Sequence, residues 1–339
     1  MIRPGAVSAA LMTAVLALGA CDSGDPTDAA APSDSGSEVA LARGPGGQLC
    51  LNCPATSSHI LFTKWSSSTH GDIYSMNPDG TGRKAIVAYD SDEFDPAWSP
   101  TYSRVAYIRH TDGPQGSQIN GIWSVGYNGL QPFRITQDYR DRGPAWGKTN
   151  RIAFYSMRES SAALTNEIFT INPDGTGVLR LTNGWAEDHN PAWSPDGTKI
   201  VFASDRAGRG RGAMHLWVMN ADGTGQTQLT FGSGEDEPAW SPDGTRIAYS
   251  VVSGGQSLAL WVMNANGTNP TSLVAGFLPA PGGWLEFHPG QATWSLDSKR
   301  IAFSSDLSGK YGLYSVAATG GAVTSLNSIA EEKAPAWSY

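Results

Sequence analysis

The sequence predicts an all-β chain that folds as a six-bladed propeller of four-stranded antiparallel blades. Three observations support this prediction. A phrase built on proline, alanine and tryptophan recurs six times, at intervals of 43–54 residues. Short β-branched and aromatic segments, separated by Gly, Pro and Asp turns, follow each copy. The incomplete repeats at the two ends of the repetitive region complement each other, as the strands of a closed ring do.

The tryptophan phrase marks the first strand of each repeat. Its fullest copies are Pro191–Thr198 and Pro238–Thr245, which both read PAWSPDGT. Weaker copies are centred on Trp98, Trp146, Trp294 and Trp337. Proline presets φ and glycine accepts a positive φ, so the SPDG part is turn chemistry. We therefore expect the tryptophans to pack between neighbouring blades and the aspartates to be turn residues before they are metal ligands.

Three further strands follow each tryptophan. The repeat that begins at Trp193 continues with Lys199–Phe202 and Leu216–Met219, and then with an Asn-Ala-Asp-Gly turn at 220–223. Its fourth strand ends near Leu229. Asp-Gly and Asn-Gly turns tolerate the positive φ that tight hairpins require. Four antiparallel strands in a period of about 40–50 residues are the signature of a propeller blade.

The two ends of the repetitive region predict how the ring closes. The first repeat has no tryptophan strand and begins at Ile60–Phe62, whereas the last has only Pro335–Tyr339. Pairing the C-terminal strand with the three N-terminal strands would complete a sixth blade and cover two open sheet edges. The alternative, an open stack of repeats, would carry capping repeats at its ends.

The N-terminal part predicts export and a lipid anchor. Residues 1–20 have a basic start at Arg3 and an apolar run from Ala6 to Ala20, as a signal peptide does. The run ends in Leu-Gly-Ala-Cys21, which resembles a bacterial lipobox, so we expect Cys21 to be lipidated. The alternative is an ordinary signal peptide with a chance cysteine. Residues 21–58 are then a flexible tether, poor in large apolar residues, and residues 59–339 form the propeller.

Cys50 and Cys53 form a lone C-x-x-C pair. A zinc site would need a second pair of ligands, and a thioredoxin-like redox site would need the pair to open a helix. The context is a loop that precedes a strand. We therefore favour a small structural disulfide in an oxidising envelope compartment.

The repeat resembles that of a known family. The phrase PAWSPDGT, together with Leu-Trp-Val-Met-Asn and Asp-Gly-Thr-Gly, is similar to the WD40-like (PD40) repeat of the TolB family over about residues 59–339. The resemblance implies a six-bladed propeller. TolB itself carries a separate α/β domain before its propeller, and here a short tether takes that place. The family's partners therefore do not carry over as a set.

A carboxylate stands five residues before the tryptophan in five of the six copies. These residues are Glu93, Asp141, Asp188, Glu235 and Glu332. The segment enters the innermost strand, so we expect an acidic ring at the mouth of the channel. Such a ring is costly, because close like charges repel, and a cationic peptide segment or a divalent cation would offset the cost. The alternative is that they are solvated loop acids, or that each caps backbone N–H groups within its own blade.

Several basic or metal-ligating residues lie near these acids in the sequence. Arg142, His189 and Lys333 could partly neutralise the ring, and His189 and His288 are the histidines to inspect for a metal. A separate basic segment, Asp205–Gly212, lies in a loop between two strands, for which solvation is favoured over binding. The net charge of −8 and the lack of a Lys/Arg cluster argue against nucleic-acid binding.

The first functional hypothesis is a monomeric, non-enzymatic module, lipid-anchored in the bacterial cell envelope, whose channel mouth recognises an envelope protein or peptide. The sequence has neither a G-x-S-x-G nucleophile elbow nor an H-E-x-x-H zinc motif. The rival is a carbohydrate-active lyase or hydrolase in which His189, His288 and Glu286 would surround a channel metal. A third alternative is a structural scaffold, because fold does not decide function.

Overall fold

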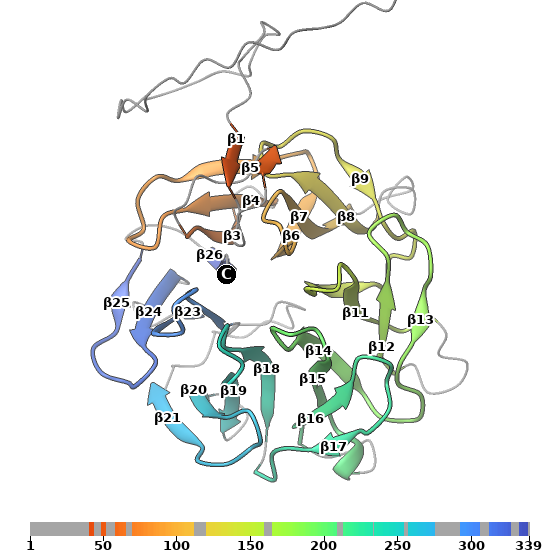
Figure 1. The fold of residues 1–339 in the computed structure, drawn as a ribbon, viewed down its shortest axis with the longest axis vertical. Coiled ribbons are helices and arrows are strands. Elements are labelled where there is room, and N and C mark those ends of the chain that lie inside the picture. Colours follow the sequence, from red (N-terminus) through yellow and green to blue (C-terminus); the bar gives the residue numbers. More distant parts are fainter. Residues whose placement is uncertain are drawn as a thin grey trace, which may run out of the picture. The chain divides into compact units, whose positions relative to one another are not determined.

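The computed structural model describes residues 41–43, 49–51, 58–65, 70–111, 120–158, 165–208, 213–232, 234–253, 257–274, 292–305, 312–326 and 332–337. From residue 58 onward, their strands form six four-stranded sheets, and every strand pair is antiparallel. The sheets stand around a common centre as the blades of a propeller (Figure 1). The predicted fold class is confirmed.

Blades 1 to 3 are consecutive in the chain, and each runs from an inner to an outer strand. Blade 1 contains β6 (Asp92–Trp98), β7 (Arg104–His110), β8 (Gly121–Gly126) and β9 (Phe133–Arg134). Blade 2 contains β10 (Arg142–Trp146), β11 (Ile152–Ser156), β12 (Glu167–Ile171) and β13 (Leu179–Arg180). Blade 3 contains β14 (Asp188–Trp193), β15 (Lys199–Ser204), β16 (His215–Asn220) and β17 (Thr227–Gln228), with a short 3₁₀ helix, η2 (Arg206–Gly208).

Blades 4 to 6 complete the ring. Blade 4 contains β18 (Glu235–Trp240), β19 (Arg246–Ser253), β20 (Ser257–Asn264) and β21 (Thr271–Val274). Blade 5 contains β22 (Ala292–Trp294), β23 (Arg300–Ser305), β24 (Gly312–Ala317) and β25 (Thr324–Ser325). Blade 6 contains β26 (Glu332–Trp337), followed by β3 (Ile60–Trp65), β4 (Gly71–Met76) and β5 (Lys84–Val87).

Blade 6 joins strands from the two ends of the propeller. β26 pairs antiparallel with β3, so that Trp337 lies opposite Ile60 and Ala336 opposite Leu61. The indole N–H of Trp98, in blade 1, donates to the carbonyl of Ala336 at 3.1 Å. The strand that closes the ring is therefore also bonded to the next blade, and the predicted closure is confirmed.

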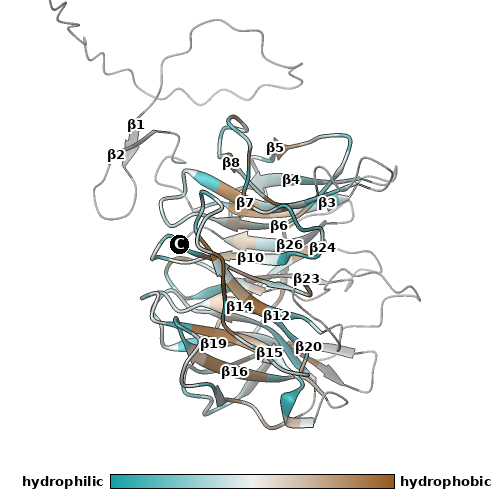
Figure 2. Ribbon diagram, turned by 90° about the vertical axis from the view of Figure 1, so that its right-hand side faces the viewer, coloured by the Kyte–Doolittle hydropathy of each residue, from teal (hydrophilic) through white to brown (hydrophobic). Residues whose placement is uncertain are grey.

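The hydrophobic core lies between neighbouring blades. Leu61 and Ile73 of blade 6 pack against Trp98 and Val105 of blade 1. Hydrophobic residues are concentrated in the strands and hydrophilic ones at the turns (Figure 2). The tryptophans Trp98, Trp193, Trp240 and Trp294 are all at most 9% exposed. The expected packing of the repeat tryptophans between blades is therefore confirmed for these four.

The SPDG turns hold themselves together by side-chain hydrogen bonds. In blade 3, the Asp196 carboxylate accepts from the Ser194 hydroxyl at 2.6 Å and from the Thr198 N–H at 3.0 Å. These hydrogen bonds lower the pKa of Asp196 to about 2. Gly197 has a φ of 74°, which only glycine adopts readily. Asp196 is thus a turn residue, as the sequence predicts.

A short hairpin lies within the predicted tether. β1 (Leu41–Arg43) pairs with β2 (Leu49–Leu51), and Leu41 is opposite Leu51. The tether composition predicts no strand, so this hairpin is a departure from the expected tether. The predicted signal peptide, Cys21 and Cys53 lie outside the described residues, as does the side chain of Cys50. No helix among the described residues is long and apolar enough to cross a membrane.

Candidate functional site: the central channel

The innermost strands each contain a bulge. The pairing register shifts just before the repeated alanine in β6, β10, β14, β18 and β26. The cause is the repeated proline, because proline has no N–H to donate to the ladder. The residue before each proline takes a left-handed conformation in four blades: φ is 53° at Asp95, 55° at Gly143, 51° at Asn190 and 51° at Glu237. We call these four residues the channel belt.

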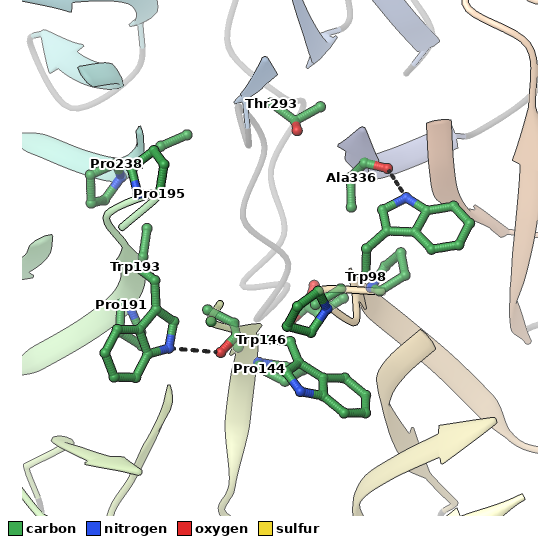
Figure 3. A pocket seen from close by; sticks show the side chains of 18 of the residues that line it. Trp98, Pro144, Trp146, Pro191, Trp193, Pro195, Pro238, Thr293 and Ala336 are labelled. Atoms are coloured by element: carbon green, nitrogen blue, oxygen red, sulfur yellow. Dashed lines mark hydrogen bonds between the residues drawn. The ribbon is translucent and has the colours of Figure 1, made fainter. Parts of the chain in front are cut away.

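The channel belt opens into a central cavity. The cavity has a volume of about 660 Å³, within the usual range for ligand sites, and residues of all six blades line it. Proline, alanine and tryptophan form most of the wall, including Trp98, Trp146 and Trp193 of three consecutive blades (Figure 3). Thr293 lies across the cavity from Trp146, and Ala336 lies beside Trp98. The wall is therefore largely apolar, and three channel-belt residues, Asp95, Asn190 and Glu237, add polar side chains to it.

Cross-blade hydrogen bonds fix the cavity wall. The indole N–H of Trp193 donates to the carbonyl of Ala145 at 3.2 Å, and that of Trp294 donates to Ala239 at 3.0 Å. Each bond joins a blade to the one before it, as the Trp98 bond does at the closure. A tryptophan that is packed on one side and hydrogen-bonded on the other has little freedom to move. The cavity is thus a preformed site.

The carboxylates that were predicted to form an acidic ring are not exposed at the channel mouth. The side chains of Glu93, Asp141, Asp188 and Glu235 are buried, with exposed fractions of 0%, 0%, 1% and 6%. Each pairs with a cationic or ionisable side chain of its own or the preceding blade: Glu93 with Arg109, Asp141 with Arg158, Asp188 with Arg206, and Glu235 with His215. The fifth, Glu332, lies opposite Lys64 in the β26–β3 ladder, and its side chain is not described. The expectation of an open acidic mouth is therefore wrong for the four described acids.

The paired arginines are the residues that the sequence reasoning missed. Arg158 donates to both carboxylate oxygens of Asp141, and its guanidinium lies 5.0 Å from the ring centroid of Phe154. Arg206 lies 2.6 Å from Asp188 and stacks on Phe202 at 5.1 Å. Each arginine thus pairs with a buried carboxylate and packs on an aromatic ring of its own blade. Their common position, just after the second strand, was the available signal.

The predicted basic loop also differs from expectation, because its first arginine is not solvated. Arg206, its first arginine, is held by Asp188 and by the Ser204 hydroxyl at 2.9 Å. It is therefore part of the blade and does not belong to a solvated loop. Residues 209–212 lie outside the described residues.

Glu93 gives stability a pH dependence. Burial raises the pKa of Glu93 from 4.5 to about 7, against the hydrogen bonds from Ser91 and Tyr89 and the charge of Arg109, which lower it. Between these values the folded chain binds more protons than the unfolded chain, so Glu93 contributes stability at pH 4.5 that is lost as the pH rises to 7. The loss amounts to about 3 kcal/mol.

We expect Glu93→Gln to remove this loss. Relative to wild type, the variant should gain about 3 kcal/mol of unfolding free energy between pH 4.5 and 7, measured by urea unfolding at a series of pH values. Asp79→Asn, in an exposed turn where the pKa lies below 3.8, is the matched control and should run parallel to wild type. A constant difference between Glu93→Gln and wild type across this range would contradict the assignment.

His189 joins two blades. Its Nε2 lies 3.0 Å from Asp236 Oδ2, and its Nδ1 lies 3.7 Å from Glu187 Oε1. Burial alone would lower the pKa of His189, but Asp236 and Glu187 outweigh burial and raise it to about 10. A doubly protonated ring cannot ligate a metal. His189 is thus a cationic link between β14 and β18.

The predicted metal has no site in the described part of the chain. No group of three or more His, Cys, Asp or Glu side chains there could hold a metal ion. His288 and Glu286, the other residues predicted to surround it, lie outside the described residues. His189, as above, is engaged by two carboxylates.

The channel belt is polar in three of its four positions. Burial raises the pKa of Glu237 well above 4.5, and the neighbouring charges of Asp236 and Asp95 raise it further. Glu237 is therefore readily protonated, and a cation placed beside it would favour its ionised form. The Asn190 amide nitrogen donates to Asp236 at 3.0 Å. These groups can accept hydrogen bonds from an N–H or ammonium donor in the channel.

Comparison with known proteins agrees with this architecture. Residues 55–278 match the family described as PD40, the TolB beta propeller domain. The TolB homologue of Chlorobium luteolum is 28% identical over 171 residues, which are 50% of this chain and 36% of that protein. The Tol-Pal system protein TolB of Rhizorhabdus wittichii is 41% identical over 56 residues, 16% of this chain and 12% of that protein. The matched segments thus cover little more than a third of these relatives at most.

The fold is also shared with a solved structure. The crystal structure of TolB from Acinetobacter baumannii superposes with a TM-score of 0.67 at 19% identity, covering 83% of this chain and 66% of that one. At this identity the likeness concerns the fold. The family match spans more than half of the chain and includes the repeats that form the blades. This chain belongs to the TolB beta-propeller (PD40) family.

Proposed function

We propose that this chain is a non-enzymatic binding module of the bacterial cell envelope, whose central channel receives a segment of a partner protein. The observation that carries the proposal is the preformed cavity of about 660 Å³ with an apolar wall and a polar channel belt. Relatives named TolB, one of them as a protein of the Tol-Pal system, support a partner among envelope proteins.

The lining indicates the chemistry of the segment. Aromatic-lined surfaces suit an extended segment in the polyproline II conformation, because such a segment is already ordered before it binds. The carboxyl groups of Asp95 and Glu237 favour a positive group, such as a lysine or an N-terminal amine. The predicted cationic ligand is retained in this proposal, and its binding groups move from the buried acids to the channel belt.

We also propose that the chain is held at a membrane of the cell envelope. The predicted signal peptide, the lipid on Cys21 and the tether would hold a monomeric propeller at the envelope membrane. The predicted disulfide between Cys50 and Cys53 would lie just before the propeller in the sequence. An oxidising envelope compartment would favour that disulfide.

The test is a pull-down with a channel variant. Asp95→Asn/Glu237→Gln removes both carboxyl groups of the channel belt, and asparagine tolerates a positive φ. We expect the immobilised variant to capture about tenfold less of the specific partner from envelope extract than wild type, as quantified by mass spectrometry. The thermal unfolding midpoint should change by only a few degrees.

A matched control carries the same change in charge. Asp79 and Asp174 lie in exposed hairpin turns, where blade 4 already has Asn266. Asp79→Asn/Asp174→Asn should capture the partner as wild type does. An unchanged set of captured proteins in the channel variant would refute the proposal.

A further inference from the structure

The central cavity has two ends with different chemistry. One end is the channel belt, and no described residue that precedes the belt in its strand lines the cavity. The other end is formed by the turns that follow the repeat tryptophans, and Pro195, Pro242 and Leu296 line it in blades 3 to 5. We call this the turn end. Lys148 follows the belt residue Gly143 by five positions, and a strand rises about 3.3 Å per residue, so the two ends lie roughly 15 Å apart.

Lys148 gives the turn end a positive charge. Among the described residues that line the cavity, Lys148 is the one cation, whereas the two acids, Asp95 and Glu237, both belong to the channel belt. The Lys148 side chain is exposed, and no carboxylate of the described residues forms an ion pair with it. The carboxylate of Asp196, in the equivalent turn of the next blade, is held by hydrogen bonds within its own turn. The cavity is therefore negative at the channel belt and positive at the turn end.

Blade 2 departs from the repeat at this point. Residues 147–150 read Gly-Lys-Thr-Asn where blades 3 and 4 have Ser-Pro-Asp-Gly, so blade 2 loses the turn aspartate and has Lys148 in place of the proline. The indole N–H of Trp146 donates to Asn150 Oδ1 at 2.9 Å, whereas that of Trp193 donates to the preceding blade.

Trp146 also differs in its exposure. It lies between Trp98 and Trp193 in the cavity wall (Figure 3), and it is partly exposed where both of these are buried. The exposed part of its ring can pack against a proline or another apolar residue of a ligand. The turn end thus offers an aromatic surface two residues from a cation.

We propose that the partner segment carries a carboxylate as well as a positive group, and that Lys148 binds this carboxylate at the turn end. The positive group then lies at the channel belt, about five residues away in a polyproline II segment that rises about 3.1 Å per residue. An apolar residue next to the carboxylate packs on Trp146. The inference rests on the proposed function, and it adds the residue that selects an acidic group and sets the direction of the bound segment.

The probes are two acetylated and amidated peptides, Lys-Pro-Pro-Pro-Pro-Glu and Glu-Pro-Pro-Pro-Pro-Lys. Each is titrated into the full chain by isothermal titration calorimetry at low salt, and the one that binds more tightly reports the direction of the segment. Replacing its glutamate by glutamine should weaken binding to wild type about fivefold, as expected for one partly exposed ion pair. Lys148→Gln should bind the glutamate and glutamine peptides equally, and Lys148→Arg should behave as wild type does.

A reversal of charge makes the test specific. Lys148→Glu should prefer a peptide in which lysine replaces the glutamate, which loss of structure cannot produce. Lys299→Gln is the matched control, because Lys299 lies in the turn of blade 5 and does not line the cavity. It should bind all peptides as wild type does.

Three outcomes would overturn the inference: no binding of either peptide to wild type, equal binding of the glutamate and glutamine forms, or a preference for glutamate that survives Lys148→Gln. The proposed function is tested separately, by partner capture with Asp95→Asn/Glu237→Gln. If that variant loses the partner and Lys148→Glu captures it as wild type does, the channel binds its partner without this carboxylate, and only the present inference fails.

Discussion

Removing residues 332–339 should leave a chain that no longer folds as a stable propeller at 37 °C. The deletion takes away β26, so β3 loses its ladder partner and Trp98 loses the carbonyl of Ala336. β26 also contacts β6 of blade 1 and β22 of blade 5, so both junctions of blade 6 open at once. Because a native domain is stable by only roughly 5–15 kcal/mol, losing one inner strand and two junctions removes most of that margin.

The measurement is thermal unfolding followed by far-ultraviolet circular dichroism. A chain that stops at Trp337 keeps the whole of β26 and is the control, with an expected midpoint within a few degrees of wild type. Adding a synthetic peptide of residues 332–339 to the truncated chain should restore part of the lost stability, since the peptide can re-form the ladder with β3. If truncation before β26 leaves the midpoint unchanged, the ring does not depend on this strand.

The fold could be predicted because the same four-strand pattern recurs along the chain. The PAWSPDGT phrase fixes the first strand and its turn, and the incomplete repeats at Ile60 and Trp337 require each other to form a blade. One strand pattern taken by itself would not have identified the fold. The same pattern recurs in every repeat, which makes the assignment of each strand more certain, and the two incomplete repeats require a closed ring.

The role of the repeated carboxylates could not be predicted in the same way. Glu93 and Arg109 lie directly opposite each other only because of the register between β6 and β7, and the bulge in β6 sets part of that register. Sequence position showed that acids enter the innermost strand, but not whether their side chains point into the channel or into the blade. The arginines Arg109, Arg158 and Arg206, each at or just after the end of a second strand, would have indicated ion pairs within the blades.

Three of the four channel-belt residues could have been recognised from the sequence. Asp95, Gly143 and Asn190 each precede the repeated proline, and Asp, Gly and Asn are the residues that accept a left-handed conformation most readily. A residue with positive φ before a proline implies a bulge, and a bulge on the innermost strand turns its side chain toward the channel. Glu237 departs from this pattern, so the fourth member required the structure.

The largest single-residue effect is expected at Arg158. Arg158→Met should lower the unfolding free energy at pH 7 by about 3–5 kcal/mol, because it leaves the buried Asp141 carboxylate without its cation. Burial already raises the pKa of Asp141, against the Arg158 interactions that lower it. Without them the carboxyl group protonates at a higher pH, so the deficit should shrink as the medium becomes acidic. Urea unfolding, followed by circular dichroism and tryptophan fluorescence, measures the effect.

A second variant distinguishes a buried charge from lost packing. Arg158→Met/Asp141→Asn removes both charges, while the amide can still bond to Thr136 and Ser156, which both interact with Asp141. Most of the lost stability should return, since a buried ion pair replaced by neutral groups of similar volume is often close to neutral in energy. A double variant as unstable as Arg158→Met would show that the guanidinium acts by packing on Phe154. Partner capture by the double variant should equal that of wild type, because the proposed function assigns binding to the channel belt and leaves the blade acids a structural role.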